Sequence, residues 1–167
     1  LAPDAFRQKF YELNEGNYNT RIVDLGNIRA GHKVSDTYVA LKLLVAELIK
    51  KNILPVIIGG GQDLTYPQFM AYEELEQKVD LLVVDSHFDL DDNIDGTIET
   101  TSISYLNKIF LHEPNFLFNF SNIGYQTFYV NQESLKLMDK LYFDVHRLGD
   151  FAGSINLAEP VIRNANM

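Results

Sequence analysis

Cysteine and tryptophan are absent from this chain of 167 residues, and no apolar run approaches the roughly 18 residues that a membrane-spanning helix requires. Without cysteine the chain can form no disulfide, thiolate zinc site or cysteine nucleophile, which fits a reducing compartment and predicts a cytoplasmic protein. Basic residues are also few, because 14 Lys and Arg stand against 23 Asp and Glu, for a net charge of −9. Nucleic-acid binding needs clustered basic side chains, so we expect neither a nucleic-acid nor a membrane partner.

The residues that are present indicate a globular domain. Hydrophobic residues make up 46% of the chain and charged residues 22%, as in ordinary soluble proteins, and the length suffices for one domain with a sizeable core. The chain begins at Leu1 rather than at an initiator methionine, and it ends at Met167 directly after an apolar stretch. We therefore expect residues 1–167 to form a single, incomplete domain of a longer protein.

Beyond its first segment, the chain alternates strand-like runs with helix-like runs. This order predicts parallel strands joined by right-handed crossovers, and hence an α/β domain with helices on both faces of a mainly parallel sheet. The predicted helices span residues 4–13, 35–51, 65–76, 102–111 and 132–140, with a last one from about residue 154. Strands are predicted at 53–58 and 80–85, both typical of strands covered on two faces, and at 115–120, where alternation indicates a peripheral strand. A further strand is predicted at 20–25 and a brief one at 141–143.

Two of the covered strands are followed by unusual polar sequence. Residues 59–63 have the sequence GGGQD, and residues 85–89 have the sequence DSHFD. Ligands of α/β proteins bind outside the carboxyl ends of parallel strands, so the two segments define one candidate site. The glycine triplet matches neither GxGxxG nor a phosphate-binding loop, which leaves a close approach to a ligand and a plain turn as its two interpretations.

Asp85, His87 and Asp89 are spaced so that an extended segment places them on one face. Two carboxylates and an imidazole that converge there would repel one another or bury charge unless a cation lay between them. Divalent ions such as Mn²⁺ accept this mixture of oxygen and nitrogen ligands. The alternative is a solvated loop whose aspartates cap the next helix and whose histidine lies on the surface.

Further acidic residues come after this segment, and three more histidines lie elsewhere. A run of acidic side chains is usually solvated, but beside a metal it could also raise the local concentration of cations. For the other histidines we expect structural or surface roles. The acidic residues are Asp91, Asp92, Asp95 and Glu99, and the histidines are His32, His112 and His146.

Together the two segments resemble the arginase/agmatinase/formimidoylglutamase family, the ureohydrolases. That family carries a GGDHS motif after one strand and a DAHxD motif after the next, and residues 59–63 and 85–89 stand in those places. Residues 141–149 (LYFDVHRLG) are similar to the stretch that leads toward the third motif of the family, SxDxD, whose aspartates are expected just beyond Met167. The resemblance implies a three-layer α/β/α fold with a mainly parallel sheet.

The resemblance also implies a pair of Mn²⁺ ions bridged by hydroxide. Carried over by position, Asp85 bridges both ions, His87 binds one, and Asp89 binds the other and orients the hydroxide as the catalytic residue. The family's metal-binding histidine is Gln62 here, and the neighbouring Asp63 could supply a carboxylate instead. In that chemistry the ions lower the pKa of bound water and hold it against the amidine or guanidinium carbon of a small-molecule substrate.

The substrate-facing position departs from the arginase pattern. Asp91 replaces the asparagine that arginases carry two residues after DAHxD, and a carboxylate there would repel a substrate carboxylate. We therefore expect a formimidoylglutamase-like hydrolase of linear amidines, weak or inactive without the third motif. The alternative is a catalytically degenerate member with a binding or structural role, which Gln62 favours. Apolar surface left uncovered in an incomplete domain also predicts a homo-oligomer.

Overall fold

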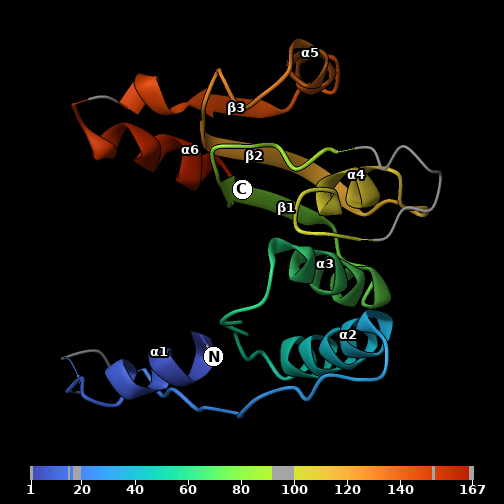
Figure 1. Ribbon diagram of the computed structural model, residues 1–167, viewed down its shortest axis with the longest axis vertical. Coiled ribbons are helices and arrows are strands. Elements are labelled where there is room, and N and C mark those ends of the chain that lie inside the picture. The colour runs from blue at the N-terminus through green and yellow to red at the C-terminus, as the bar shows by residue number, and fades with distance from the viewer. Residues whose placement is uncertain (1, 15, 17–19, 92–99, 152, 166–167) are drawn as a thin grey trace.

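The computed structural model describes residues 2–14, 16, 20–91, 100–151 and 153–165 (Figure 1). The strands of this part form one sheet, and short 3₁₀ turns precede or follow several elements. The helices are α1 (Ala2–Phe10), α2 (Val34–Lys50), α3 (Thr65–Glu74), α4 (Tyr105–Phe110), α5 (Gln132–Lys140) and α6 (Glu159–Asn164), and the strands are β1 (Val79–Val84), β2 (Leu117–Tyr125) and β3 (Asp144–Arg147). The helices lie within a few residues of their predicted positions.

The sheet is parallel, as predicted, with the strand order β1-β2-β3. α4 connects β1 to β2, and α5 connects β2 to β3. In Figure 1, α3 and α2 lie beyond β1, and α5 lies beyond β3. The carboxyl ends of β1 and β2 are in register, because Val84 pairs with Ile123 and Asp85 donates its N–H to the carbonyl of Ile123 (3.1 Å). The loops that leave these two strands therefore start at the same edge of the sheet.

The prediction that residues 115–120 form a peripheral strand is wrong, because β2 is the central strand of the described sheet. Its buried run begins at Phe120, where the alternating pattern ends, and continues through the two polar residues Ser121 and Asn122. Only the entry to the strand alternates, with Phe118 turned to solvent. Because the buried half of β2 contains polar residues, the hydrophobic pattern of the sequence did not indicate that this strand is central.

Two predicted strands are absent from the described structure. Residues 20–25 and 53–58 run without a strand assignment, and their apolar side chains are largely exposed, as for Leu54 (84% exposed). A strand requires a hydrogen-bonded neighbour, and neither run pairs with another strand within the described ranges. Apolar composition alone therefore did not decide their conformation.

The last predicted strand is displaced along the chain. β3 covers Asp144–Arg147 rather than residues 141–143, because α5 ends at Lys140 and Tyr142 then adopts a left-handed φ of +58°. The helix itself begins at a conventional cap, since the Asn131 side chain accepts a hydrogen bond from the Ser134 N–H (2.7 Å).

The core has two parts. A smaller cluster lies between α2 and α3, and a larger one joins α3, α4 and α5 to the sheet. Phe88, from the segment after β1, is buried in the larger cluster and contacts Tyr125 at 5.2 Å between ring centroids. The core thus fixes the segment that carries the candidate ligands. No helix among the described residues is long and apolar enough to span a membrane.

Candidate functional site

The segment 85–89 lies where the sequence predicted it, at the carboxyl end of β1. Phe88 anchors the segment in the core, and the Asn122 side chain of β2 donates a hydrogen bond to the carbonyl of His87 (3.2 Å). The segment bends rather than continuing the strand, and Asp89 has a left-handed φ of +50°. As a result the three candidate ligands differ in depth: Asp89 is buried, Asp85 is partly buried and His87 is about half exposed.

Asp85 is held as an anion by a set of donors. Its carboxylate accepts hydrogen bonds from the Gln62 side chain, the His87 N–H (2.9 Å) and the Ser86 hydroxyl (3.4 Å). Burial raises the pKa of Asp85, but the hydrogen bond from Gln62 and those from the backbone outweigh it, so the pKa lies below its ordinary value. The contact with Gln62 also brings the two sequence motifs together, as predicted, although the run before the glycines is not a strand.

Asp89 lies in the opposite situation. Burial first, and then the charge of Asp85, raise its pKa to about 6. Its Oδ2 atom is buried and has no hydrogen-bond partner in the described part of the chain. Leaving a carboxylate oxygen buried and unpaired is unfavourable. The Oδ1 atom of the neighbouring Asn122 is likewise buried without a described partner.

His87 is positioned by two contacts. Its Nδ1 atom lies 2.8 Å from the Ser86 hydroxyl and 3.6 Å from Oδ1 of Asp85. Its ring stacks on Tyr129, with ring centroids 4.9 Å apart and ring planes 7° apart. Tyr129 and Asn122 were not predicted as site residues. Tyr129 follows the carboxyl end of β2, so the rule that sites form at the carboxyl ends of neighbouring strands could have found it, whereas Asn122 lies within the strand.

Asp63 and Asp91 lie at the edges of this arrangement. The Asp63 carboxylate accepts a hydrogen bond from the Tyr38 hydroxyl of α2 (2.6 Å). Asp91 is exposed and is tied to Ile103 through its N–H (3.0 Å), and its charge adds to the raised pKa of Asp89. The remaining acidic residues of the predicted run, Asp92, Asp95 and Glu99, lie outside the described residues.

The side chains of this site are of the types that bind a divalent cation, but they are not gathered closely around one point. Carboxylate oxygens and an imidazole are ligands that Mn²⁺ accepts, and a cation would relieve both the unpaired oxygen of Asp89 and its repulsion from Asp85. Within the described ranges, however, no group of three or more Asp, Glu, His or Cys side chains is gathered closely enough to hold a metal ion. The metal-binding roles of Asp85, His87, Asp89 and Asp63 therefore stay predictions.

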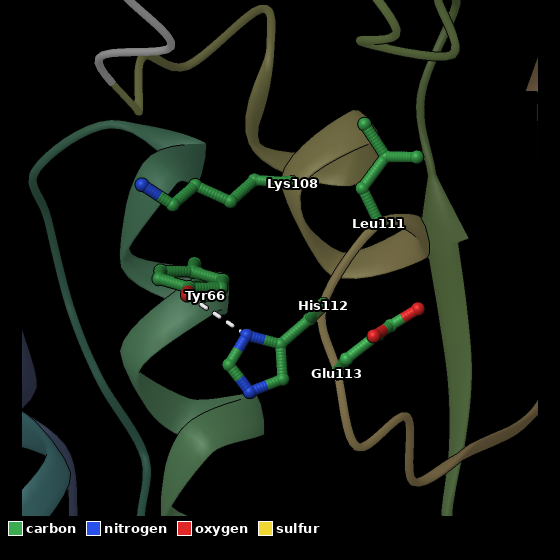
Figure 2. Close-up of a pocket in the computed structure, with 5 residues that line it drawn as sticks. All are labelled: Tyr66, Lys108, Leu111, His112 and Glu113. Carbon is green, nitrogen blue, oxygen red and sulfur yellow. Dashed lines mark hydrogen bonds between the residues drawn. The ribbon is translucent and has the colours of Figure 1, made fainter.

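His112 has a structural role away from this site, in line with expectation. Its Nδ1 atom lies 3.1 Å from the Tyr66 hydroxyl and its Nε2 atom lies 2.8 Å from a carboxylate oxygen of Glu73, so it joins the end of α4 to α3. A cavity of about 290 Å³ adjoins these residues. Figure 2 shows the Lys108 side chain above the Tyr66 ring and the Glu113 side chain pointing away from it.

Comparison with known proteins shows the family of this chain. The sequence model of the arginase family matches residues 1–155, and the chain belongs to that family. Over 91 residues it is 32% identical to a formimidoylglutamase of Staphylococcus aureus (strain JH9), a match that covers 53% of this chain and 29% of that protein.

Solved structures give the same result for the fold. A Trypanosoma cruzi formiminoglutamase crystallised with Mn²⁺ superposes with a TM-score of 0.83 at 19% identity, over 98% of this chain and 57% of that one. An agmatine ureohydrolase of Thermoplasma volcanium superposes with a TM-score of 0.71 at 20% identity, over 96% and 55%. The predicted arginase-like α/β/α fold class is confirmed, and the chain spans little more than half of these relatives.

Proposed function

We propose that this chain carries part of the active site of a metal-dependent ureohydrolase that hydrolyses a C–N bond of a linear amidine. The observation that carries the proposal is the pair formed by Asp85 and Asp89. One carboxylate is kept anionic by its donors, and the other is buried beside it with an unpaired oxygen. This pair stands at the carboxyl end of a parallel strand, where α/β proteins bind their ligands.

In this proposal Asp85, His87 and Asp89 would hold Mn²⁺, and Asp63 would supply a further carboxylate. When bound, Mn²⁺ lowers the pKa of a coordinated water molecule and polarises the amidine. Asp85 contributes a fixed negative charge, because Gln62 and the His87 N–H hold its oxygens in place. Asp89 has an oxygen free to accept a hydrogen bond from the attacking water and so to orient it. Phe88 keeps both carboxylates in position through the core.

We place formimidoylglutamate first among the substrates. The curated relative with 32% identity is a formimidoylglutamase, and Asp91 stands where arginases carry an asparagine. The exposed carboxylate of Asp91 disfavours arginine held as an arginase holds it, and the two carboxylates of formimidoylglutamate must likewise bind away from Asp91, so the ranking rests on the relative. A guanidino compound such as agmatine is the comparison substrate.

A degenerate family member with a binding or structural role is the second candidate. The observation in its favour is the hydrogen bond from Gln62 to Asp85, which occupies an oxygen that a metal ion would need. The short distance of Asp63 from Tyr38 (2.6 Å) likewise assigns that carboxylate to a protein contact.

Metal content and turnover separate the two candidates. The protein is produced with Mn²⁺ in the medium, its metal content is measured by mass spectrometry, and formamide release from formimidoylglutamate is followed beside agmatine and arginine. Bound Mn²⁺ with preferential formamide release supports the hydrolase. No bound Mn²⁺ and no turnover on any of the three, in a chain extended past Met167 to include the third motif, supports the degenerate protein.

The ligand assignment has a matched control on the same strand. Asp85→Ala should abolish Mn²⁺ binding, because it removes the carboxylate that is kept anionic beside Asp89. Asp80→Ala removes an exposed carboxylate from the opposite part of β1 and should leave binding unchanged. Equal affinities of the two variants would show that the ligands are wrongly assigned.

A further inference from the structure

The imidazole of His87 lies flat against the ring of Tyr129. The centroids are 4.9 Å apart and the planes differ by 7°. The His87 side chain is 51% exposed, so core packing does not fix the plane of its ring. Among the described residues, the ring contacts this phenol, the Ser86 hydroxyl through Nδ1, and Oδ1 of Asp85 at 3.6 Å from the same nitrogen.

Tyr129 is itself held against the segment that carries His87. It belongs to the connection between β2 and α5, where its N–H donates to the carbonyl of Gln126 (2.9 Å). The N–H of Gln126 in turn donates to the carbonyl of Ser86 (3.0 Å), and the neighbouring Val130 packs against the larger core cluster. The connection between β2 and α5 is therefore held in place before and after Tyr129, and its backbone keeps the phenol ring against His87.

We propose that Tyr129 is a positioning residue that restricts the plane of the His87 ring and so favours the binding of a divalent cation by this histidine. This inference rests on the proposed function. Parallel stacking of two rings favours one plane of the imidazole and so reduces the freedom that His87 loses when it coordinates. An imidazole bound to a cation also carries more positive charge, which strengthens its attraction to the negative face of the phenol ring. Groups that orient a ligating histidine commonly determine metal affinity.

The competing explanation is that two half-exposed rings stack without consequence for the site. The chain offers a control for it, because Phe128 is adjacent to Tyr129 and 98% exposed. Removing Phe128 changes the same connection without touching His87. Tyr129→Phe keeps a ring for the stack and removes only the hydroxyl, whereas Tyr129→Ala removes the ring.

The experiment measures Mn²⁺ binding to the metal-free chain by calorimetry and the His87 ring resonances by NMR without metal. Tyr129→Ala should weaken Mn²⁺ binding about fivefold to tenfold. It should also abolish the ring-current shift of the His87 protons, which His87→Gln identifies among the four histidines. Tyr129→Phe and Phe128→Ala should keep the Mn²⁺ affinity and the ring-current shift of the unchanged chain.

Each other result would overturn the inference in a recognisable way. Mn²⁺ binding that is as tight in Tyr129→Ala as in the unchanged chain removes the positioning role and leaves the proposed function standing. An equal loss of affinity in Phe128→Ala shows a general loosening of the connection. Weaker Mn²⁺ binding by Tyr129→Ala without a change in the His87 resonances shows that Tyr129 does not act through the His87 ring. If the unchanged chain binds no Mn²⁺, this inference fails for the chain, whereas the proposed function is tested on the chain extended past Met167.

Discussion

At the scale of single residues, burial and the neighbouring negative charges act together on Asp89, and both raise its pKa. The carboxyl group is buried beside Asp85 and Asp91, and its pKa of about 6 records the resulting preference for the neutral form. Asp85 has the reverse shift because donors surround it. Two carboxyl groups four residues apart thus differ in their protonation at weakly acidic pH, below about 6, and the difference comes from their surroundings alone.

This difference predicts how the stability of the metal-free chain changes with pH. The unfolded Asp89 titrates near its ordinary pKa of about 3.9 and the folded one near 6, so between these values the folded state binds the extra proton. The contribution of Asp89 to the free energy of unfolding should therefore fall as pH rises through this window, by about 1 kcal/mol from pH 5 to pH 7.

The measurement is urea unfolding in EDTA at pH 5 and pH 7, for the unchanged chain and for Asp89→Asn. The variant has no proton to exchange at this position, so the difference between the two proteins isolates the contribution of Asp89 from that of the other carboxyl groups. Identical pH dependence in both proteins would contradict the raised pKa.

Gln62 is the second residue for which the structure gives a sharp expectation. Its side chain donates to Asp85 where the resembled family carries a metal-binding histidine. Gln62→His should remove the competing hydrogen bond and add an imidazole ligand, and so tighten Mn²⁺ binding about tenfold or more. Calorimetric titration with Mn²⁺ tests this, with Gln68→His on α3 as a control that leaves the site unchanged. Weaker or unchanged binding in Gln62→His would place residue 62 outside the metal site.

At the scale of elements, the central strand β2 organises the site. It pairs with β1 on one side and β3 on the other, and its Asn122 holds the segment after β1 through the carbonyl of His87. Phe120 is fully buried between Phe110 and Phe143, at 5.7 and 5.6 Å between ring centroids. The interior of the domain is therefore built on the strand that the sequence pattern had placed at its periphery.

Two phenylalanines of this strand should respond very differently to truncation. Phe120→Ala opens a cavity in the core and should lower the free energy of unfolding by about 3–5 kcal/mol. Phe118→Ala changes a ring that is 66% exposed and should lower it by less than about 1 kcal/mol. Denaturant unfolding of both variants gives the comparison, and losses of similar size would contradict the central position of β2.

At the scale of the whole molecule, apolar surface outside the core is the conspicuous feature. Residues 20–25 and 53–58 expose most of their apolar side chains, and β1 pairs on only one side among the described strands. Exposed apolar segments and open sheet edges favour association with further chain, including copies of the same molecule.

We accordingly predict that the purified chain self-associates as its concentration rises. Replacing Leu54 and Val56 by lysine should shift the equilibrium toward the monomer, since it adds charge to exposed positions without disturbing the core. Analytical ultracentrifugation over a concentration series measures this, with lysine at the exposed position Glu12 as a control for charge alone. A chain that is monomeric at all concentrations would refute the prediction.

The sequence by itself determined the helices, the parallel direction of the strands and the family. These depend on local patterns and on residue types at fixed spacing. It placed Asp85, His87 and Asp89 at the end of a strand and joined them correctly to the segment of Gln62. Those results need no knowledge of distant contacts, since hydrophobic period and motif spacing are properties of short stretches.

Tertiary structure alone decided which apolar runs pair as strands and which strand is central, because a ladder depends on a partner elsewhere in the chain. It also decided the depth of each carboxylate, the partner of Asp63 and the stack of Tyr129 on His87. Burial and contact between residues far apart in sequence follow from packing, and packing sets the pKa of Asp89 and the orientation of His87.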